Sequence, residues 1–100
     1  MNISMTHHDG VLTVTLDGGL DYTVSSQMES LINDLNAIKA GKVVFDLAKV
    51  PRVDSVGLGM LHLAKDCILE SGTKLILRGA AGSVLRLFEL TDSARSFEIE

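Results

Sequence analysis

Short apolar segments of strand character alternate along this chain with longer segments of helical periodicity, and this alternation constrains the fold more than any other feature. Residues 11–17 place Leu12 and Leu16 on the same side as Val14, a period of two that is typical of a half-buried strand. Residues 42–47 and 74–78 each contain a continuous apolar run, which is typical of an interior strand. The segments between these strands are long enough for helices, so we expect parallel pairing through right-handed crossovers.

The segment 23–40 predicts the first helix. Its apolar residues follow one another at intervals of four, three, four and three, which places them on one helical stripe. We expect Thr23 to cap this helix and Gly41 to end it. The stripe consists of Val24, Met28, Leu31, Leu35 and Ile38.

Two further helices and two outer strands complete the predicted order. A second helix fits from Ser55 to about residue 70, before Gly72, and a third fits over 83–90. Residues 1–8 form a hairpin with the next strand, because Asp-Gly separates the two. Residues 97–99 form a last short strand. The predicted fold is therefore α/β with a mixed sheet in the order ββαβαβαβ, and residues 1–100 are expected to be a single domain.

The composition excludes several classes of function. The net charge of −4 gives no basic surface for nucleic acid or anionic lipid, and the four aromatic residues (three Phe and one Tyr) are few for base stacking. No apolar run approaches the roughly 20 residues that span a bilayer. Residues 1–8 lack the basic and apolar regions of a signal peptide, so we expect a cytoplasmic protein with no membrane insertion. The single cysteine and three histidines form no metal-binding pattern.

The segment 53–61 carries the most functional information. Ser55 is expected to cap the second helix, and Gly57 and Gly59 follow in its first turn, where they leave the backbone open to close approach by another surface. On a helical wheel Leu58 falls beside His62 on the polar side, so we expect Leu58 to be at least partly exposed. The inward arc of the same wheel consists of Met60, Leu61, Ala64, Cys67 and Ile68.

A phosphate on Ser55 would face the positive end of the helix dipole and would be tolerated there. It would add about −1.5 to −2 charges, which any partner docking against Ser55 and Leu58 would meet. These residues are therefore suited to a binding switch. Taken by themselves they favour the plainer interpretation, in which Ser55 is a helix cap and nothing more.

Four ordered motifs resemble the STAS domain, specifically the single-domain anti-sigma factor antagonists (anti-anti-sigma factors). The segment 54–59, Asp-Ser-Val-Gly-Leu-Gly, resembles the Asp-Ser-x-Gly-Leu-Gly motif that carries the family's phosphorylated serine. Residues 18–21, 43–47 and 84–91 resemble the family's motifs before the first helix, in the central strand and in the third helix. Gly19 and Val56 depart from the pattern, since an acid and a small or hydroxyl residue are usual there.

The resemblance implies a STAS-like mixed sheet with helices packed mainly on one face, and a partner-switching regulator of bacterial transcription or signalling. The unphosphorylated form would bind and sequester an anti-sigma factor or related serine kinase, and phosphorylation of Ser55 would release it. A PP2C-type serine phosphatase would restore binding. The chain itself would be no enzyme, would hold no cofactor and would be a monomer when free. The implied partner-binding residues are Asp21, Asp54, Ser55, Val56, Gly57, Leu58, Gly59 and His62.

Two other classes of protein are weighed against the switch. One is a STAS accessory subunit of a lipid or anion transporter, in which Ser55 need not be phosphorylated. The other is a small enzyme that uses Ser55 with Asp21, Asp46 and Asp54. A phospho-aspartate receiver would require an acidic pair after the first strand, which is missing, so we expect Asp21 and Asp46 to bind loop amides and Asp54 to flank the helix cap.

Three isolated residue groups have plainer interpretations. The adjacent His7 and His8 would point to opposite faces of a strand, so we expect them to be solvated and not to bind a metal. Cys67 is expected to be a small buried apolar residue. Lys49 and Arg52 flank the Ser55 loop, where they either help a partner to dock or solvate the loop.

Overall fold

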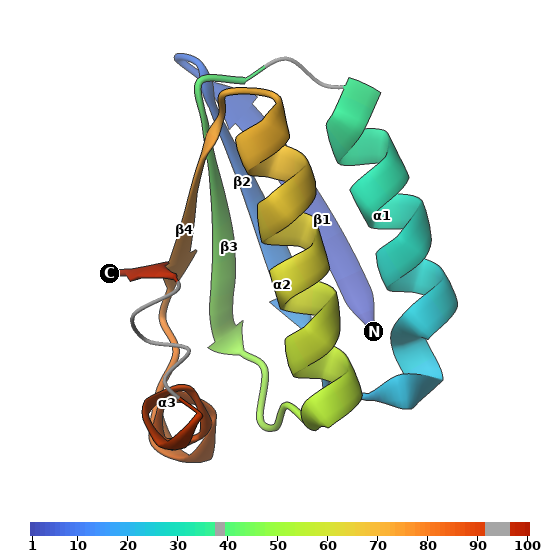
Figure 1. Cartoon of the computed structure of the whole chain (residues 1–100), viewed down its shortest axis with the longest axis vertical. Coiled ribbons are helices and arrows are strands. Elements are labelled where there is room, and N and C mark those ends of the chain that lie inside the picture. The colour runs from blue at the N-terminus through green and yellow to red at the C-terminus, as the bar shows by residue number, and fades with distance from the viewer. Residues whose placement is uncertain (38–39, 92–96) are drawn as a thin grey trace.

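A five-stranded sheet in the order β1-β2-β3-β4-β5 forms the centre of the computed structural model (Figure 1). Strand β1 (Asn2–His8) is antiparallel to β2 (Val11–Asp17). Strands β2, β3 (Lys42–Lys49), β4 (Lys74–Arg78) and β5 (Glu98–Ile99) are mutually parallel, which confirms the predicted mixed α/β sheet. The structure describes residues 1–37, 40–91 and 97–100.

The β1–β2 connection is the predicted hairpin. Asp9 and Gly10 have φ angles of 51° and 76°, and two positive φ values are what a type I′ turn requires. This turn places Leu12 and Leu16 of β2 on the buried face, where they are 3% and 0% exposed. The alternation read from the sequence therefore corresponds to the two faces of β2.

Helices α1 (Ser25–Ala37) and α2 (Ser55–Glu70) lie side by side on one face of the sheet, as expected (Figure 1). The shorter helix α3 (Gly82–Leu90) lies at the end of the molecule where α2 begins. In the part of the chain that the structure describes, no helix combines the length and apolarity needed to cross a membrane.

The core fills the space between the sheet and the helices. Phe45 of β3, Met28 of α1 and Leu61 of α2 are all fully buried in it, together with Phe88 of α3. The described part of the predicted α1 stripe is buried, whereas Ile38 lies outside the described residues.

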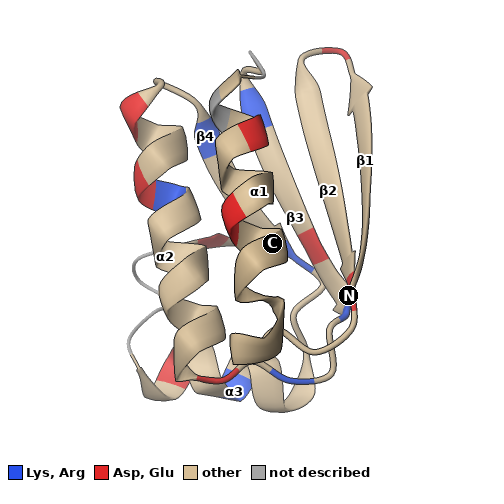
Figure 2. Ribbon diagram, turned by 90° about the vertical axis from the view of Figure 1, so that its right-hand side faces the viewer, with Lys and Arg blue, Asp and Glu red and all other residues tan. Residues whose placement is uncertain are grey.

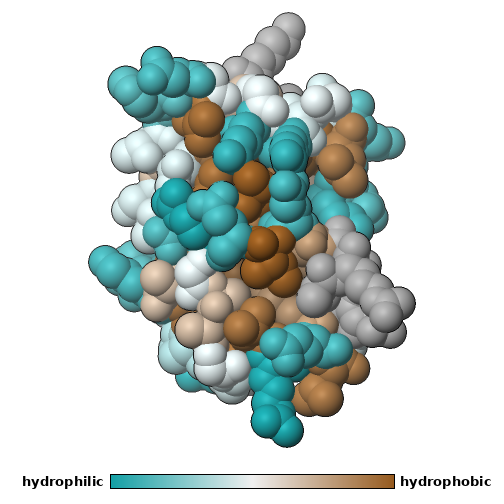
Figure 3. All heavy atoms as spheres, turned by 90° about the vertical axis from the view of Figure 1, so that its left-hand side faces the viewer, coloured by the Kyte–Doolittle hydropathy of each residue, from teal (hydrophilic) through white to brown (hydrophobic). Residues whose placement is uncertain are grey.

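The opposite face of the sheet is flanked by charged side chains. Arg78 Nη2 lies 3.6 Å from Asp46 Oδ2, and Lys74 Nζ lies 3.1 Å from Glu98 Oε1. On the face that carries β4 and the C-terminal strand, apolar atoms emerge between hydrophilic ones (Figure 3). The helices cover the core side of the sheet, and on the other side these ion pairs between neighbouring strands accompany the buried Val44 and Ile76.

The first helical segment begins differently from the prediction. A 3₁₀ turn, η1 (Tyr22–Val24), precedes α1, and Asp21 caps this turn by accepting a hydrogen bond from the Thr23 backbone N–H at 3.0 Å. Thr23 was therefore wrongly predicted as the cap. The physical reason is that Asp21 has the extended backbone of a cap (φ −137°), whereas Thr23 is already inside the turn.

Candidate functional site

The loop that leads into α2 is fixed against the loop that follows β2. The Leu20 N–H donates to the Arg52 carbonyl at 2.9 Å, and the Asp54 N–H donates to the Leu20 carbonyl at 3.2 Å. Leu20 and Val53 form a parallel bridge between these two bonds. The start of α2 and the segment 18–22 are therefore one braced unit at the carboxyl ends of β2 and β3.

Asp54, and not Ser55 as predicted, caps α2. Asp54 has an extended backbone (φ −94°, ψ −177°), and its Oδ1 accepts a hydrogen bond from the Gly57 N–H at 2.7 Å. Its Oδ2 accepts a second, longer bond from the Tyr22 N–H at 3.4 Å. The observed cap is one residue before the predicted one, because the hydrogen bond to Leu20 keeps the Asp54 backbone extended. Ser55 is therefore the first helical residue.

Ser55 is exposed at the N-terminus of α2. Among the described residues, its hydroxyl makes no hydrogen bond, so the helix does not depend on it. The hydroxyl lies where the dipole of a 16-residue helix favours negative charge, although the Asp54 carboxylate is its sequence neighbour. Chemically, this is a free hydroxyl that can accept a substituent without loss of a native contact.

The two glycines of the first turn have different environments. Gly57 is buried, and a Cβ atom there would lie 2.0 Å from the Leu20 carbonyl oxygen. A Cβ on the exposed Gly59 would meet nothing within 4 Å. The expectation that both glycines leave the backbone open to a partner is therefore wrong for Gly57, because Leu20 of the same chain occupies that space.

The remaining predicted binding residues on α2 differ in exposure. Val56 is 44% exposed, whereas Leu58 is half-buried and packs against the core. The half-buried His62 places its ring 4.6 Å from that of Phe97. Of the predicted inward arc, Leu61, Ala64 and Ile68 are buried and Met60 and Cys67 are half-buried.

Asp21 is 8% exposed, and its carboxylate is bound inside the protein. Oδ1 accepts bonds from the Thr23 backbone N–H and hydroxyl, and Oδ2 accepts one from Arg52 Nη2 at 2.9 Å. The bonds from Thr23 and then Arg52 lower the pKa of Asp21 below its ordinary value. Asp46 accepts a bond from the Ala48 N–H at 3.0 Å, so both acids bind backbone amides, although these amides lie in η1 and at the end of β3 and not in loops.

Two neighbours of Ser55 lie outside the expected partner-binding residues: Tyr22 was not identified from the sequence, and Arg52 was left open between helping a partner to dock and solvating the loop. Tyr22 is 70% exposed beside the cap of α2, and the Arg52 side chain is 70% exposed although it pairs with Asp21. Acidic and basic residues both occur at this end of the molecule (Figure 2). The signal that could have identified Tyr22 is the position of the chain's single tyrosine directly after Gly-Gly-Leu-Asp.

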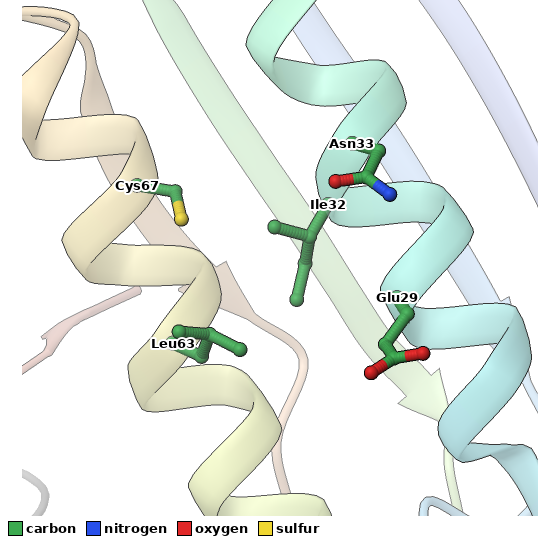
Figure 4. A pocket seen from close by; sticks show the side chains of 5 residues that line it. All are labelled: Glu29, Ile32, Asn33, Leu63 and Cys67. Atoms are coloured by element: carbon green, nitrogen blue, oxygen red, sulfur yellow. The ribbon is translucent and has the colours of Figure 1, made fainter.

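The described residues can be compared with what a metal site or a small-molecule site requires. These contain no group of three His, Cys, Asp or Glu side chains placed to hold a metal ion. His7 and His8 are exposed on β1. An open groove of ≈350 Å³ lies between α1 and α2, with Leu63 and Cys67 on one side and Ile32 on the other (Figure 4). Leu63 is about 12 Å along the axis of α2 from Ser55, so the groove is a separate feature.

The STAS domain family matches residues 2–100, and the chain belongs to this family. It is 25% identical to the anti-sigma-B factor antagonist of Staphylococcus aureus (strain NCTC 8325 / PS 47) over 91% of this chain and 84% of the relative. It is also similar to the crystal structure of an anti-sigma factor antagonist from Mycobacterium paratuberculosis. That similarity has a TM-score of 0.81 at 27% identity and covers 98% of this chain and 83% of the other.

Two more distant structures share the fold. The phosphorylated form of the Bacillus cell fate determinant SpoIIAA matches with a TM-score of 0.73 at 13% identity, over 99% of this chain and 91% of that one. A sulfate transporter family protein from Wolinella succinogenes matches with a TM-score of 0.81 at 15% identity, over 94% of this chain and 79% of that one. At these identities the likeness shows the STAS fold alone, which proteins of different function share.

Proposed function

We propose that this chain is a partner-switching regulator controlled by phosphorylation of Ser55. The unphosphorylated form binds and sequesters an anti-sigma factor or a related serine kinase, phosphorylation releases that partner, and a PP2C-type phosphatase restores binding. The observation that carries the proposal is the exposed Ser55 hydroxyl at a helix start that Asp54 already caps. The names of the relatives as anti-sigma factor antagonists support the same function.

The geometry explains why a phosphate would affect binding more than folding. A phosphate on Ser55 adds about −1.5 to −2 charges beside the Asp54 carboxylate. Asp54 is held in place by the Gly57 and Tyr22 amides, so the two negative groups stay close. The positive end of the helix dipole offsets part of this repulsion within the fold. A partner that covers Val56, Leu58 and Gly59 would instead have to desolvate the new charge.

In this proposal the chain binds and does not catalyse. Among the described residues, no side chain is hydrogen-bonded to the Ser55 hydroxyl as a general base would be. The Asp54 carboxylate already serves as the helix cap. ATP and magnesium would belong to the kinase, and the chain would need no cofactor of its own.

The second candidate is a STAS accessory subunit of a lipid or anion transporter. It is favoured by the fold similarity to the sulfate transporter family protein. In such a subunit the surface at the start of α2 would dock permanently, and Ser55 would remain unmodified.

Incubation with candidate serine kinases and Mg-ATP, followed by intact-mass measurement, separates the two candidates. The switch predicts the gain of one phosphate in the wild-type chain and none in Ser55→Ala. In titrations against the same kinase, Ser55→Ala should bind at least as tightly as wild type, and Ser55→Asp should bind more weakly. Unchanged mass together with stable co-purification of a transporter subunit would favour the second candidate.

A further inference from the structure

We propose that Tyr22 and Arg52 form a docking surface for a protein that presents an apolar recess beside an Asp or Glu carboxylate. This rests on the proposed function, since it specifies the partner of the same switch. The sequence did not identify Tyr22 as a binding residue, and it left Arg52 open between helping a partner to dock and solvating the loop. Both flank the first turn of α2 in the structure.

Tyr22 has the properties of a binding anchor. The only tyrosine of the chain is 70% exposed, although its ring could bury a large apolar area. Its backbone is held on both sides, because the Asp21 cap fixes η1 and the Tyr22 N–H donates to Asp54 Oδ2 at 3.4 Å. A rigid backbone lowers the entropy lost when the ring is buried by a partner, and tyrosine is enriched among residues that dominate binding energy.

Arg52 presents a cation that is held by Asp21, the residue directly before Tyr22. Its Nη2 donates to Asp21 Oδ2 at 2.9 Å, yet its side chain is 70% exposed while that of Asp21 is 12% exposed. Arginine has five N–H donors in a planar fork, and the ion pair with Asp21 uses one N–H of Nη2. The guanidinium therefore keeps donors that can face a partner.

Gly19 makes this position of Arg52 possible. A Cβ atom at Gly19 would lie 2.9 Å from Arg52 Cζ and 3.0 Å from Arg52 Nη2, so a side chain there would push the guanidinium away. The surface beside Ser55 therefore presents the Arg52 cation over the open space that Gly19 leaves.

The charges select the chemistry of the partner. A guanidinium fork pairs best with a carboxylate or phosphate. Asp21 pairs with Arg52, and Asp54 accepts a bond from the Tyr22 N–H, so a polyanion such as nucleic acid or an anionic bilayer would meet repulsion from these two acids, whereas one carboxylate next to an apolar recess would fit. A phosphate on Ser55 would repel the same carboxylate, which agrees with release on phosphorylation.

Photo-cross-linking in the native cell tests this surface. The photoreactive amino acid p-benzoyl-L-phenylalanine replaces Tyr22 in the full chain, and it replaces Leu69 in a matched control. Leu69 is 53% exposed and lies about 21 Å along α2 from Ser55. We expect one protein to be cross-linked from position 22 and not from position 69, and mass spectrometry of the cross-linked peptide identifies it. No cross-link from position 22, or one to lipid or nucleic acid, overturns the proposal.

The identified protein is then purified and titrated. Arg52→Gln should weaken binding about tenfold, a loss that only a minority of interface residues cause, whereas Lys49→Gln, which removes an exposed cation nearby, should weaken it less than about twofold. In the partner, one Asp→Asn or Glu→Gln substitution should weaken binding to the wild-type chain. The same substitution should not weaken binding to the Arg52→Gln chain any further. The proposal is overturned if Arg52→Gln and Lys49→Gln lose the same affinity. It is also overturned if the affinity losses from Arg52→Gln and from the partner substitution are additive.

The outcomes separate this inference from the switch. A kinase that phosphorylates Ser55 but is not cross-linked from position 22 leaves the switch intact and overturns the docking surface. A cross-linked acidic partner whose binding is unchanged in Ser55→Asp supports the docking surface and contradicts the switch. Melting curves of Arg52→Gln and Arg52→Lys control for folding, and Arg52→Lys should retain part of the affinity because it keeps the charge.

Discussion

The Asp54 carboxylate lies 2.7 Å from the Gly57 backbone nitrogen and caps α2, which leaves the adjacent Ser55 hydroxyl outside the hydrogen bonding of the helix. Structural and regulatory tasks are thereby divided between two neighbouring residues. The acid holds the helix start in place, and the hydroxyl is exposed for modification.

This division predicts stability effects of different size at the two positions. Asp54→Ala should lower the free energy of unfolding by about 0.5–2 kcal/mol, because it removes the cap. Ser55→Ala should change it by less than about 0.5 kcal/mol, as is usual for exposed positions. Denaturant titrations of both variants provide the measurement, with Asp54→Asn as a control that retains a capping side chain. A Ser55→Ala loss as large as that of Asp54→Ala would contradict the assignment.

The two glycines of α2 provide a second matched pair. Gly57→Ala should destabilise the fold by about 3 kcal/mol, the upper end for overpacking, because its Cβ would collide with the Leu20 carbonyl that also binds the Asp54 N–H. Gly59→Ala should stabilise it by about 0.5–1 kcal/mol, since alanine is the better helix former and the space is open. Thermal melts of the two variants should shift in opposite directions, and equal shifts would refute this account.

Leu58 and Leu61 should differ in stability and in binding. Leu61→Ala should cost about 2–5 kcal/mol of stability, because the side chain is fully buried. Leu58→Ala should cost about 1–2 kcal/mol, since Leu58 is half-buried and packs on the core. In titrations against the kinase that modifies Ser55, Leu58→Ala should lose more than about 1 kcal/mol of binding energy. Unchanged affinity would remove Leu58 from the docking surface.

Asp21 should contribute to the acid limb of the stability curve. Its pKa in the folded protein is lowered below 3.8 by the bonds from Thr23 and Arg52, so the folded state favours the ionised form. The stabilisation is fully present above the ordinary pKa and is lost as the pH falls from about 4 through the lower folded value. Denaturant titrations between pH 2 and pH 6 should show a shallower acid limb for Asp21→Asn than for wild type, whereas an identical slope would exclude the linkage.

The sequence by itself determined the order of the elements and their buried faces. The alternation of Leu12, Val14 and Leu16 and the stripe through Met28 and Leu31 are local periodicities, and each element can bury only the face that they define. The Asp-Gly hairpin was equally predictable, because a two-residue turn with two positive φ angles favours these residue types. The position of Ser55 at the start of α2 also follows from the sequence pattern.

Only the tertiary structure decided how the start of α2 is used. Asp54 and Ser55 are both good capping residues, and the choice between them depends on the backbone angles that pairing with Leu20 imposes. The need for glycine at position 57, and the position of Arg52 over Gly19, also arise from contacts between segments more than 30 residues apart. Local propensity is nearly equal for the alternatives at these positions, so contacts between distant segments settle the outcome.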